Sequence, residues 1–544
     1  MKISYTRIHL LGALFSAALL AGGGRAAGTL VVTVGRNFVG STYGLNTFNR
    51  PADGEGSIGP AHFVELINGR FAIYSKTNGA LVQSTSDTVF WQNSGISFPG
   101  GQSVSDPRVV FDPTSQRWFA SAIVFDPSTL AGNSFVVAIS GSTDPTGPWN
   151  GLSLVADTVS SNFADFPTLG MDSDGVYLSA NMFPAAGGNP IGSALVSIPK
   201  ADLLATTPTA TNATFFGLLS YADYGAVLQP VFNPAGTGSA RVVAVGSLGI
   251  DFAFHSNLVF STITHAAGPG AARLSAPSSI PVDPYFVTIN PPQPDPAADD
   301  LDDGDARISA VARQVGNVIY AVHGVEADAL LVGDRWTGQA AIRWYKIDAS
   351  NGAIIQSGTL SDPVMHYFFP SIAANADGTV VIGCNGCSTN SYIGSYAFVG
   401  ETSNGVTSFA PARLLKLGRA NYKFTEAGAG ISRWGDYSAT SVDPIDSTRF
   451  WTIQMVPSAA QVYYTQITEV RAVKQPVLTL SQTSTNVTLT WPVPVGSFAL
   501  QSTTNLGPGA VWGPASAAYA TNSGVISATL PASADRAFFR LQLQ

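Results

Sequence analysis

The sequence predicts an all-β fold built from a repeated unit, and three observations lead to this prediction. First, the stretch Phe166–Tyr177 recurs in altered form at Phe369–Val380, so that FPTLGMDSDGVY aligns with FPSIAANADGTV without gaps. Second, only 11% of the residues are charged, while the chain contains 55 Gly and 34 Pro. Third, short β-prone runs bounded by Gly, Pro, Asn, Asp and Ser dominate the sequence, and no convincing amphipathic helix exceeds about three turns.

The N-terminal residues 1–27 have the pattern of a cleaved secretion signal. Lys2 and Arg7 precede the apolar run Ile8–Ala21, which is followed by small residues. A membrane span needs roughly 20 apolar residues, so this run is too short to cross a bilayer, and no later stretch is apolar enough. We therefore expect a soluble protein that is secreted, either extracellular or held at the cell surface by a partner.

The repeated unit predicts a strand, a tight turn and a second strand. Its Asp-Gly pair between β-prone runs is a strong hairpin signal, because Gly accepts the positive φ that such turns demand. Weaker copies bring the number of units to seven, with starts near Pro60, Asp106, Asp165, Gln229, Asp305, Phe369 and Asp436. Their spacing suits four strands each, and radial repetition of four-stranded sheets is the β-propeller arrangement. We therefore predict a seven-bladed propeller over residues 28–473.

Two further features fit the ring. Paired aromatic residues follow Asp-Pro turns in Arg117–Phe119 and Arg449–Trp451, where one ring of each pair can fill the wedge between neighbouring blades. The β-branched run Thr29–Val34 lies outside the first unit. We expect it to close the ring by pairing with a strand near Gln461–Val470.

A second domain is predicted for residues 474–544. Short alternating strands follow Pro476, and Trp491 and Trp512 are available to a core. About 70 residues with this pattern fit a small β-sandwich of the immunoglobulin or fibronectin type III kind. The full prediction is therefore an all-β chain, a seven-bladed β-propeller followed by a small β-sandwich.

Several segments together resemble a group of exported bacterial β-propeller proteins of mostly unassigned function. They are GPAHFVELINGRFAIYSKTNG, SDPRVVFDPTSQRWF, STDPTGPW, DFPTLGMDSDGVYLSAN and RWGDYSATSVDPIDSTRFW. The resemblance covers roughly residues 34–470 and implies the fold more than any chemistry. The tail is similar to a β-sandwich found at the C-terminus of many exported bacterial proteins, which implies attachment, sorting or spacing.

The segment STDPTGPW also resembles the Asp-box of sialidases, through Ser142, Asp144, Gly147 and Trp149, with the Gly displaced by one residue. That box is structural in sialidases. A sialidase also needs three arginines for the substrate carboxylate, a Tyr nucleophile with a Glu partner, and an Asp acid. The residues available for such roles are Arg108, Arg307, Arg433 and Tyr437.

The candidate binding site follows from the geometry of a propeller, in which the innermost strands begin on one face around a central channel. The strand starts and their neighbours supply the candidate ligand-binding residues, which are Asp106, Arg108, Asp165, Asp305, Arg307, His366, Arg433, Trp434, Asp436 and Tyr437. Converging carboxylates repel one another unless a cation or the arginines neutralise them. Ca²⁺ is the cation that suits several carboxylate oxygens, and the alternative is that each Asp caps its own turn or pairs within its blade.

Other motifs are weaker. Cys384 and Cys387 form CNGC after a strand, where they make either a small disulfide or two unpaired thiols in a turn. The acidic run Asp295–Asp305 lacks the spacing of an EF-hand loop, and we expect a solvated loop there. The six His residues form no zinc motif.

Two functions remain open from the sequence. The first is a monomeric exported propeller that binds an extracellular glycan or protein at its channel face and is displayed by the sandwich. The second is a glycoside-active enzyme, a hydrolase or lyase, that uses carboxylates at the same face. The net charge of -8 argues against a nucleic-acid partner, because such partners need a basic face.

Overall fold

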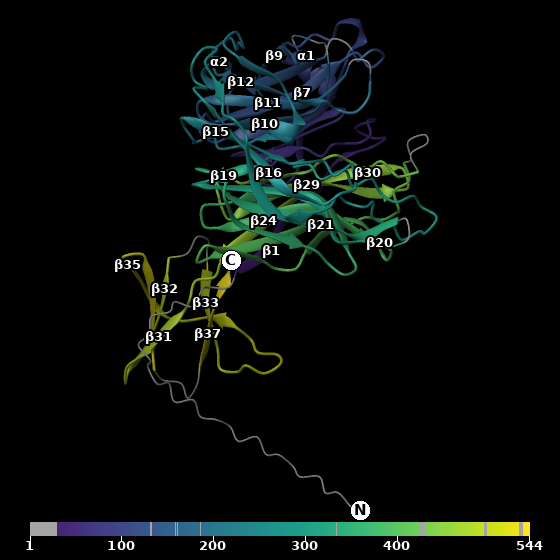
Figure 1. The fold of residues 1–544 in the computed structure, drawn as a ribbon. Coiled ribbons are helices and arrows are strands. Elements are labelled where there is room, and N and C mark those ends of the chain that lie inside the picture. The colour runs from purple at the N-terminus through teal and green to yellow at the C-terminus, as the bar shows by residue number, and fades with distance from the viewer. Residues whose placement is uncertain are drawn as a thin grey trace, which may run out of the picture. The chain divides into compact units, whose positions relative to one another are not determined.

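The structure, a computed structural model, describes residues 30–130, 133–157, 159, 162–184, 187–332, 335–424, 430–493, 498–532 and 537–544. The expected secretion signal lies outside these residues. The described chain divides into two compact units, Leu30–Val473 and Lys474–Gln544 (Figure 1). None of the helices in the described part of the chain is long and apolar enough to span a membrane.

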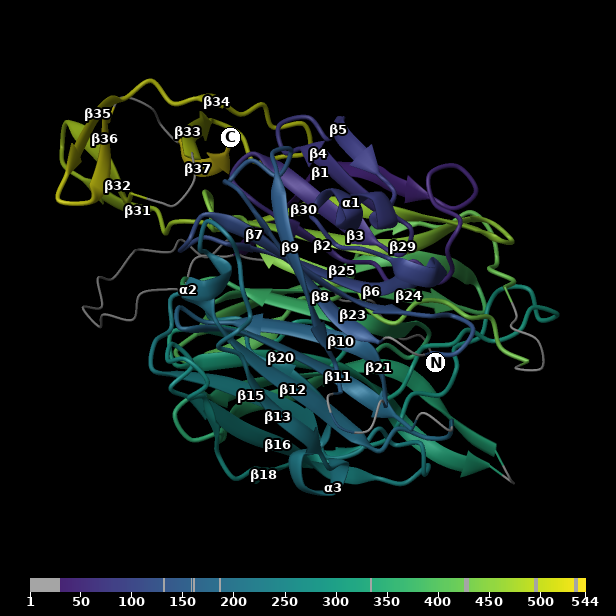
Figure 2. The ribbon, with the colours of Figure 1, turned by 90° about the horizontal axis from the view of Figure 1, so that it is seen from above.

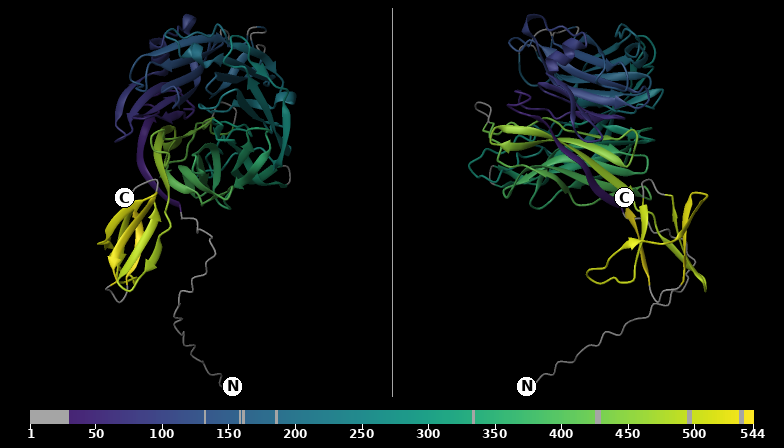
Figure 3. Two further views of the ribbon diagram at one scale, coloured as in Figure 1. Left: turned by 90° about the vertical axis from the view of Figure 1, so that its left-hand side faces the viewer. Right: turned by 180° about the vertical axis from the view of Figure 1, so that it is seen from behind.

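In the first unit, the described residues form seven antiparallel sheets of four or five strands, which Figure 3 shows as a ring. The predicted seven-bladed propeller is therefore confirmed. Blade 1 is formed by β2 (Gly56–Ile58), β3 (His62–Ile67), β4 (Arg70–Ser75) and β5 (Leu81–Thr85), and blade 2 by β6 (Ser103–Asp112), β7 (Arg117–Phe125), β8 (Ser134–Ser140) and β9 (Trp149–Val155). Blade 3 is formed by β10 (Phe163–Met171), β11 (Gly175–Phe183), β12 (Gly192–Pro199) and β13 (Thr214–Leu219). Blade 4 is formed by β14 (Ala226–Pro230), β15 (Ser239–Val245), β16 (His255–Thr264), β17 (Arg273–Leu274) and β18 (Ser278–Tyr285).

Blades 5 to 7 complete the ring. They are formed by β19 (Arg313–Val315), β20 (Val318–Val332), β21 (Arg335–Asp348) and β22 (Ile354–Leu360); β23 (His366–Ala374), β24 (Thr379–Ser388), β25 (Ser391–Ser403), β26 (Val406–Phe409) and β27 (Arg413–Leu417); and β28 (Ala439–Val442), β29 (Arg449–Ala459), β30 (Val462–Lys474) and β1 (Leu30–Thr42). Short helical segments lie between strands, namely α1 (Asp87–Asn93), η1 (Pro99–Gly101), α2 (Lys200–Leu203) and α3 (Tyr221–Tyr224).

Two inner strands lie away from their predicted places. In blade 1 the innermost strand is β2, so the hairpin predicted from Pro60 is formed by the second and third strands, β3 and β4. In blade 5 the innermost strand begins at Arg313, eight residues after Asp305 (313 minus 305). The intervening residues, with the loop before them, lie at the channel mouth.

The repeated Phe-Pro pair has a structural cause. In blades 2, 3, 4 and 6 the innermost strand carries a β-bulge, in which two of its residues lie opposite one residue of the second strand. The first bulged residue has a left-handed φ, at Asp106 (56°), Phe166 (53°), Val227 (58°) and Phe369 (46°). The second is Pro in three of the four blades, which suits a position outside the hydrogen-bond ladder because Pro has no N–H.

In blades 3 and 6, which carry the repeat, the far end of the inner hairpin is a turn organised by an Asx side chain. Asp172 accepts from the backbone N–H groups of Asp174 and Gly175, at 2.8 and 2.7 Å, and Asn375 accepts from Thr379. The two predicted hairpins are therefore present, but their turns are Asx turns of more than two residues. Gly378 has a positive φ of 79°, whereas Gly175 does not lie in the left-handed region.

The predicted ring closure is confirmed, because β1 pairs with β30 in blade 7 (Figure 2). A buried carboxyl group, Glu65 of blade 1, ties the closing strands to the next blade. It accepts hydrogen bonds from the Ser41 backbone and hydroxyl (3.2 and 2.7 Å), from Tyr74 (2.9 Å) and from Thr465. One side chain therefore joins β1, β30 and blade 1.

The aromatic pairs fill the wedges between blades, as predicted. Trp118 packs with blade 1 residues, while Phe119 points to the other side of the sheet and packs with blade 3. Trp451 likewise packs against blade 1, and Phe450 against blade 6. Successive strand residues point to opposite faces, so each pair serves two interfaces.

The second unit contains two sheets in its described residues. They consist of β31 (Thr479–Gln482), β32 (Asn486–Pro492), β36 (Val525–Pro531) and β35 (Ala518–Asn522), and of β34 (Gly513–Pro514), β33 (Phe498–Thr503) and β37 (Phe538–Leu543). Trp491 is buried in the core of this sandwich with Leu500 and Leu541. Trp512 is half-buried, with the Arg540 guanidinium 4.4 Å from its ring, and does not join that core.

Replacing Glu65 tests the closure of the ring. Glu65→Ala leaves the buried donors of Ser41, Tyr74 and Thr465 without an acceptor, and we expect it to lower the free energy of unfolding of the propeller by about 3 kcal/mol. Tyr74→Phe removes one of these hydrogen bonds, and we expect a loss of about 1 kcal/mol. Chemical denaturation measures both. A loss for Glu65→Ala no larger than that for Tyr74→Phe would contradict this role.

Candidate functional site

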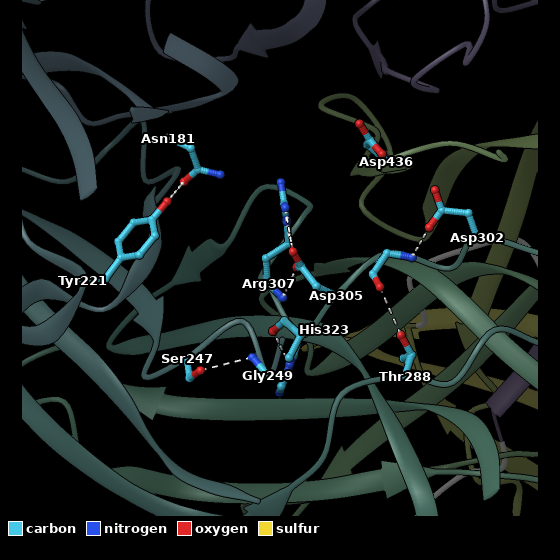
Figure 4. Close-up of polar contacts among 12 residues, drawn as sticks. Asn181, Tyr221, Ser247, Gly249, Thr288, Asp302, Asp305, Arg307, His323 and Asp436 are labelled. Atoms are coloured by element: carbon cyan, nitrogen blue, oxygen red, sulfur yellow. Dashed lines mark hydrogen bonds and ion pairs between the residues drawn. The ribbon is translucent and has the colours of Figure 1, made fainter. Parts of the chain in front are cut away.

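The mouth of the channel holds a small pocket lined by three blades and the loops between them. Its walls are formed by Phe166, Asp303, Gly304, Asp305, Arg307, Ser309, Gly324, Phe369, Pro370 and Asp436, and its volume is about 40 Å³. A cavity needs roughly 10–15 Å³ to hold one water molecule, so this one holds a few waters or one small chemical group. Figure 4 shows Asp302, Asp305, Arg307 and Asp436 gathered here.

Two arginine–aspartate ion pairs dominate the mouth. Arg307 binds Asp305 through two nitrogens, at 2.7 and 2.6 Å (Figure 4). Arg433 binds Asp436 at 2.7 and 2.9 Å and also reaches Asp302 at 3.1 Å. All five side chains are 13–23% exposed, so they are accessible from solvent. Paired geometry holds each guanidinium in a fixed orientation.

Asp106 and the unpredicted Asp53 instead link neighbouring blades. Asp106 accepts from the backbone N–H of Phe166 at 3.1 Å, and Asp53 accepts from the backbone N–H of Asp436 at 3.1 Å. The Asn68 side chain bridges the two, because its amide N–H donates to Asp53 and its oxygen accepts from the Asp106 backbone. Both aspartates are buried and have a left-handed φ. Their role is therefore to hold the mouth together.

The carboxyl groups at the mouth have pKa values that are shifted in opposite directions. Burial, with the nearby Asp106 and Asp436 carboxyls, raises the pKa of Asp165 to about 7. Burial and the neighbouring Asp436 also raise the pKa of Asp106. At Asp436 burial is outweighed by Arg433 first and then by Arg307 and Arg108, so its pKa is lowered. The mouth therefore combines Asp165, a carboxyl with a pKa of about 7 beside the pocket, with Asp436, a carboxyl of lowered pKa in the pocket wall.

The structure brings Asp106, Asp165, Asp305, Arg307, Arg433 and Asp436 together at or beside the mouth. Arg108 lies beneath it, fully buried, donating to the carbonyls of Pro167 and Ser309 at 2.8 and 3.0 Å, with the Tyr437 ring 3.4 Å from its guanidinium carbon. Tyr437 is buried and donates to the carbonyl of Pro107. Both residues were predicted to bind a ligand, and neither has a free surface to do so.

Two further predicted ligand residues belong to the core. Trp434 is fully buried, packs edge-on against Tyr422 and donates to the Asn385 side chain at 3.1 Å. His366 is buried in β23, where it accepts from the backbone N–H of Ala340, and burial lowers its pKa to about 4. Side chains of neighbouring residues in an extended segment point to opposite sides. Trp434 therefore does not share the exposure of Arg433, although the two are adjacent in sequence.

Cys384 and Cys387 are free and buried on the strand β24, in neither a disulfide nor a turn. Cysteines three positions apart on a strand point to opposite faces, so their sulfur atoms cannot meet. Burial raises the pKa of both thiols.

The acidic loop before blade 5 contributes more than the solvated loop that we expected. Asp302 pairs with Arg433, and Asp303 is 3% exposed at the pocket wall. The two bulge rings Phe166 and Phe369 form the apolar wall. Sequence reasoning missed these residues, although the position of Phe166 and Phe369 at matching places in the repeat was a usable signal.

In the part of the chain that the structure describes, the mouth contains no preformed metal centre, and its arginines are paired. Among the described residues, no three His, Cys, Asp or Glu side chains are grouped so that they could hold a metal ion. The three arginines that a sialidase-like site would need are committed, since Arg307 and Arg433 bind carboxylates and Arg108 binds backbone carbonyls. The three arginines that the sequence offered for such a site therefore already have partners within the protein.

The raised pKa of Asp165 predicts a pH-dependent stability. From pH 3.8 to about 7 the folded state holds a proton that the unfolded state releases, so rising pH destabilises the fold. Asp165→Asn removes this effect. We therefore expect the free energy of unfolding of this variant, minus that of the native protein, to increase by about 1 kcal/mol between about pH 5 and about pH 8. Unfolding measured at both pH values checks this, with the exposed Asp377→Asn as control. An equal difference at the two pH values would contradict it.

Comparison with known proteins identifies a similar fold in other chains but no family. No protein-family model and no curated protein matches the chain. The polysaccharide lyase Uly1 is 9% identical, with 78% of this chain and 90% of that chain covered and a TM-score of 0.37. The Penicillium chrysogenum alpha-L-arabinanase is 12% identical, with coverages of 67% and 92% and a TM-score of 0.34. The WD40 domain of Toxoplasma gondii coronin is 8% identical, with coverages of 82% and 87% and a TM-score of 0.38. Likenesses this distant carry no argument about ligand or chemistry.

Proposed function

We propose that this chain is a secreted binding protein that recognises an extracellular glycan at the channel mouth of its propeller. The observation that carries the proposal is the accessible pair of Arg–Asp ion pairs, Arg307–Asp305 and Arg433–Asp436, facing one pocket from different blades. For ion pairs that are largely buried, as these are, the cost of removing the charges from water offsets much of their attraction. Their convergence in a pocket is better explained by ligand recognition.

The chemistry of the pocket suits a polyhydroxylated ligand. Fixed carboxylates accept hydrogen bonds from hydroxyl groups, and the two Phe rings supply an apolar wall. Exposed rings extend this surface: Phe252 and Phe254 are each 56% exposed and flank Phe286 at 6.4 and 5.1 Å. They lie on the loop from β15 to β16, whose Leu248 carbonyl accepts from the backbone N–H of Ala306 beside Arg307. The pocket itself holds one group of a ligand whose remainder lies over the rim.

The N-terminal signal pattern and the C-terminal sandwich support the cellular setting of this proposal. A secretion signal places the propeller outside the cell, where glycans are abundant. The sandwich would then display or anchor the propeller, and a monomer suffices because the pocket is built from one chain.

A matched pair of substitutions tests the binding role. We expect Asp436→Asn to weaken glycan binding at least about tenfold, because it breaks the Arg433 pair at the pocket. Asp446→Asn alters the Asp446–Arg449 pair, which has the same i,i+3 spacing in the same blade but lies in the turn at the other end of its inner hairpin, and should leave binding unchanged. A glycan array followed by calorimetry measures both. Equal affinities for the two variants would argue against the mouth as the binding site.

One observation favours a second candidate, a glycoside-active enzyme. The raised pKa of Asp165, about 7, and the lowered pKa of Asp436 are the pattern of an acid and a base in one site. An enzyme of this kind would use Asp165 to protonate the leaving oxygen while Asp436 acts on the opposite side.

Product analysis separates the two candidates. If the protein is an enzyme, prolonged incubation with the bound glycan should give new reducing ends or unsaturated ends, and Asp165→Asn should reduce their rate at least about a hundredfold. If it is a binding protein, the glycan stays intact and Asp165→Asn changes only its affinity.

A further inference from the structure

The pocket contains a buried carboxyl group that the described residues do not fully satisfy. Neither carboxylate oxygen of Asp303 has a hydrogen-bond partner of good geometry, although the side chain is only 3% exposed. The nearby Thr288 hydroxyl lies 3.5 Å from the Gly304 carbonyl (Figure 4), and its weak interaction with Asp303 acts against the raised pKa of that carboxyl. A buried polar group without a partner is costly, at about 1–3 kcal/mol, so such a group at a pocket wall points to a ligand that supplies the missing donor.

The charge of the mouth defines the kind of donor. Five carboxyl groups face two guanidinium groups here, namely Asp165, Asp302, Asp303, Asp305 and Asp436 with Arg307 and Arg433. When Asp165 and Asp303 are protonated, three carboxylates still face these two guanidinium groups, and Arg108 beneath them has its own carboxyl partner in Glu55 at 3.4 Å. Both guanidinium groups already bind carboxylates, so an anionic group would find repulsion in this pocket and a cationic group would find attraction.

The walls suit an organic cation better than a metal ion. The acidic side chains are not grouped tightly enough to coordinate a metal among the described residues. The Phe166 ring already has the Arg307 guanidinium carbon 4.3 Å from its centroid, and Phe369 offers a second ring. Aromatic faces attract ammonium groups, and a volume of about 40 Å³ accommodates one such group. Gly304 keeps this wall open, because its φ is +82° and an added Cβ would lie 3.1 Å from the Phe369 ring.

We propose that the pocket receives a protonated primary amine of its glycan ligand, with Asp303 as the innermost acceptor, so that the recognised unit is an amino sugar. This inference rests on the proposed glycan-binding function and names its substrate class. The ammonium donates to the Asp303 carboxylate, and its charge offsets the acidic excess of the mouth.

Proton release is a consequence of this arrangement. Burial first, with the nearby Glu326 carboxyl, raises the pKa of Asp303 well above its usual value, which favours the protonated form in the empty pocket. An arriving ammonium favours the ionised form, and the Asp303 proton passes to the buffer. Binding enthalpy should therefore depend on the ionisation enthalpy of the buffer.

The test compares a glucosamine oligomer with an N-acetylglucosamine oligomer of the same length by calorimetry on the full chain. We expect the free amine to bind at least about tenfold more tightly, with proton release for the amine alone. Asp303→Asn should abolish both the preference and the proton release, whereas Asp377→Asn, an exposed control in the Asn375–Thr379 turn, should keep them.

The outcomes separate this inference from the proposed function. Equal affinities of the native protein for the glucosamine and N-acetylglucosamine oligomers would overturn the amine site and leave glycan binding intact. This comparison does not depend on the folding of a variant. Binding only of neutral or acidic glycans, still weakened by Asp436→Asn, would also overturn the amine site alone. Absence of any glycan ligand on the array would overturn both.

Discussion

The β-bulge at the start of the inner strands is the constraint on which the channel mouth depends. At Asp106 and at three equivalent positions a non-glycine residue adopts a left-handed φ, which costs about 1–2 kcal/mol per residue. The bulge takes two residues of the inner strand out of the regular hydrogen-bond ladder. Asp106 uses that position to accept from the Phe166 backbone of the next blade. The strain is thus offset by contacts between blades, and Asp53 and Asn68 extend the same chain of hydrogen bonds to blade 7.

The hydrogen bonds between blades also determine how close the charged side chains of the mouth lie to one another. Acidic side chains are held near one another by backbone contacts. Burial and their mutual repulsion raise the pKa of Asp165 and of Asp106, and the arginine pairs at Asp305 and Asp436 offset the remaining charge. A ligand with a positive charge or with hydroxyl donors would further reduce the repulsion among these carboxyl groups. Pre-organised sites of this kind bind without paying to assemble their polar groups.

The sequence was sufficient for the architecture because the repeat reports local geometry. Phe166-Pro167 and Phe369-Pro370 mark the bulge, and the Asx turns mark the ends of the inner hairpins, so the number of blades and the closing strand could be predicted. Side-chain direction could not. Trp434 and Tyr437 lie close in sequence to the partly exposed Asp436 yet are buried in the core, and His366 lies on a buried strand. Asp303 was unpredictable for another reason, since its burial depends on how an acidic loop folds against blade 5 and Phe369.

A crystal structure of the protein with a glycan selected on an array is the most direct test of ligand binding at the channel mouth. We expect the sugar to lie over the mouth, with a ligand donor within hydrogen-bonding distance of Asp303 or Asp436 and the sugar ring against Phe166 or Phe369. A glycan bound at the opposite face of the propeller or on the sandwich, with an empty mouth, would show that the mouth is not the binding site.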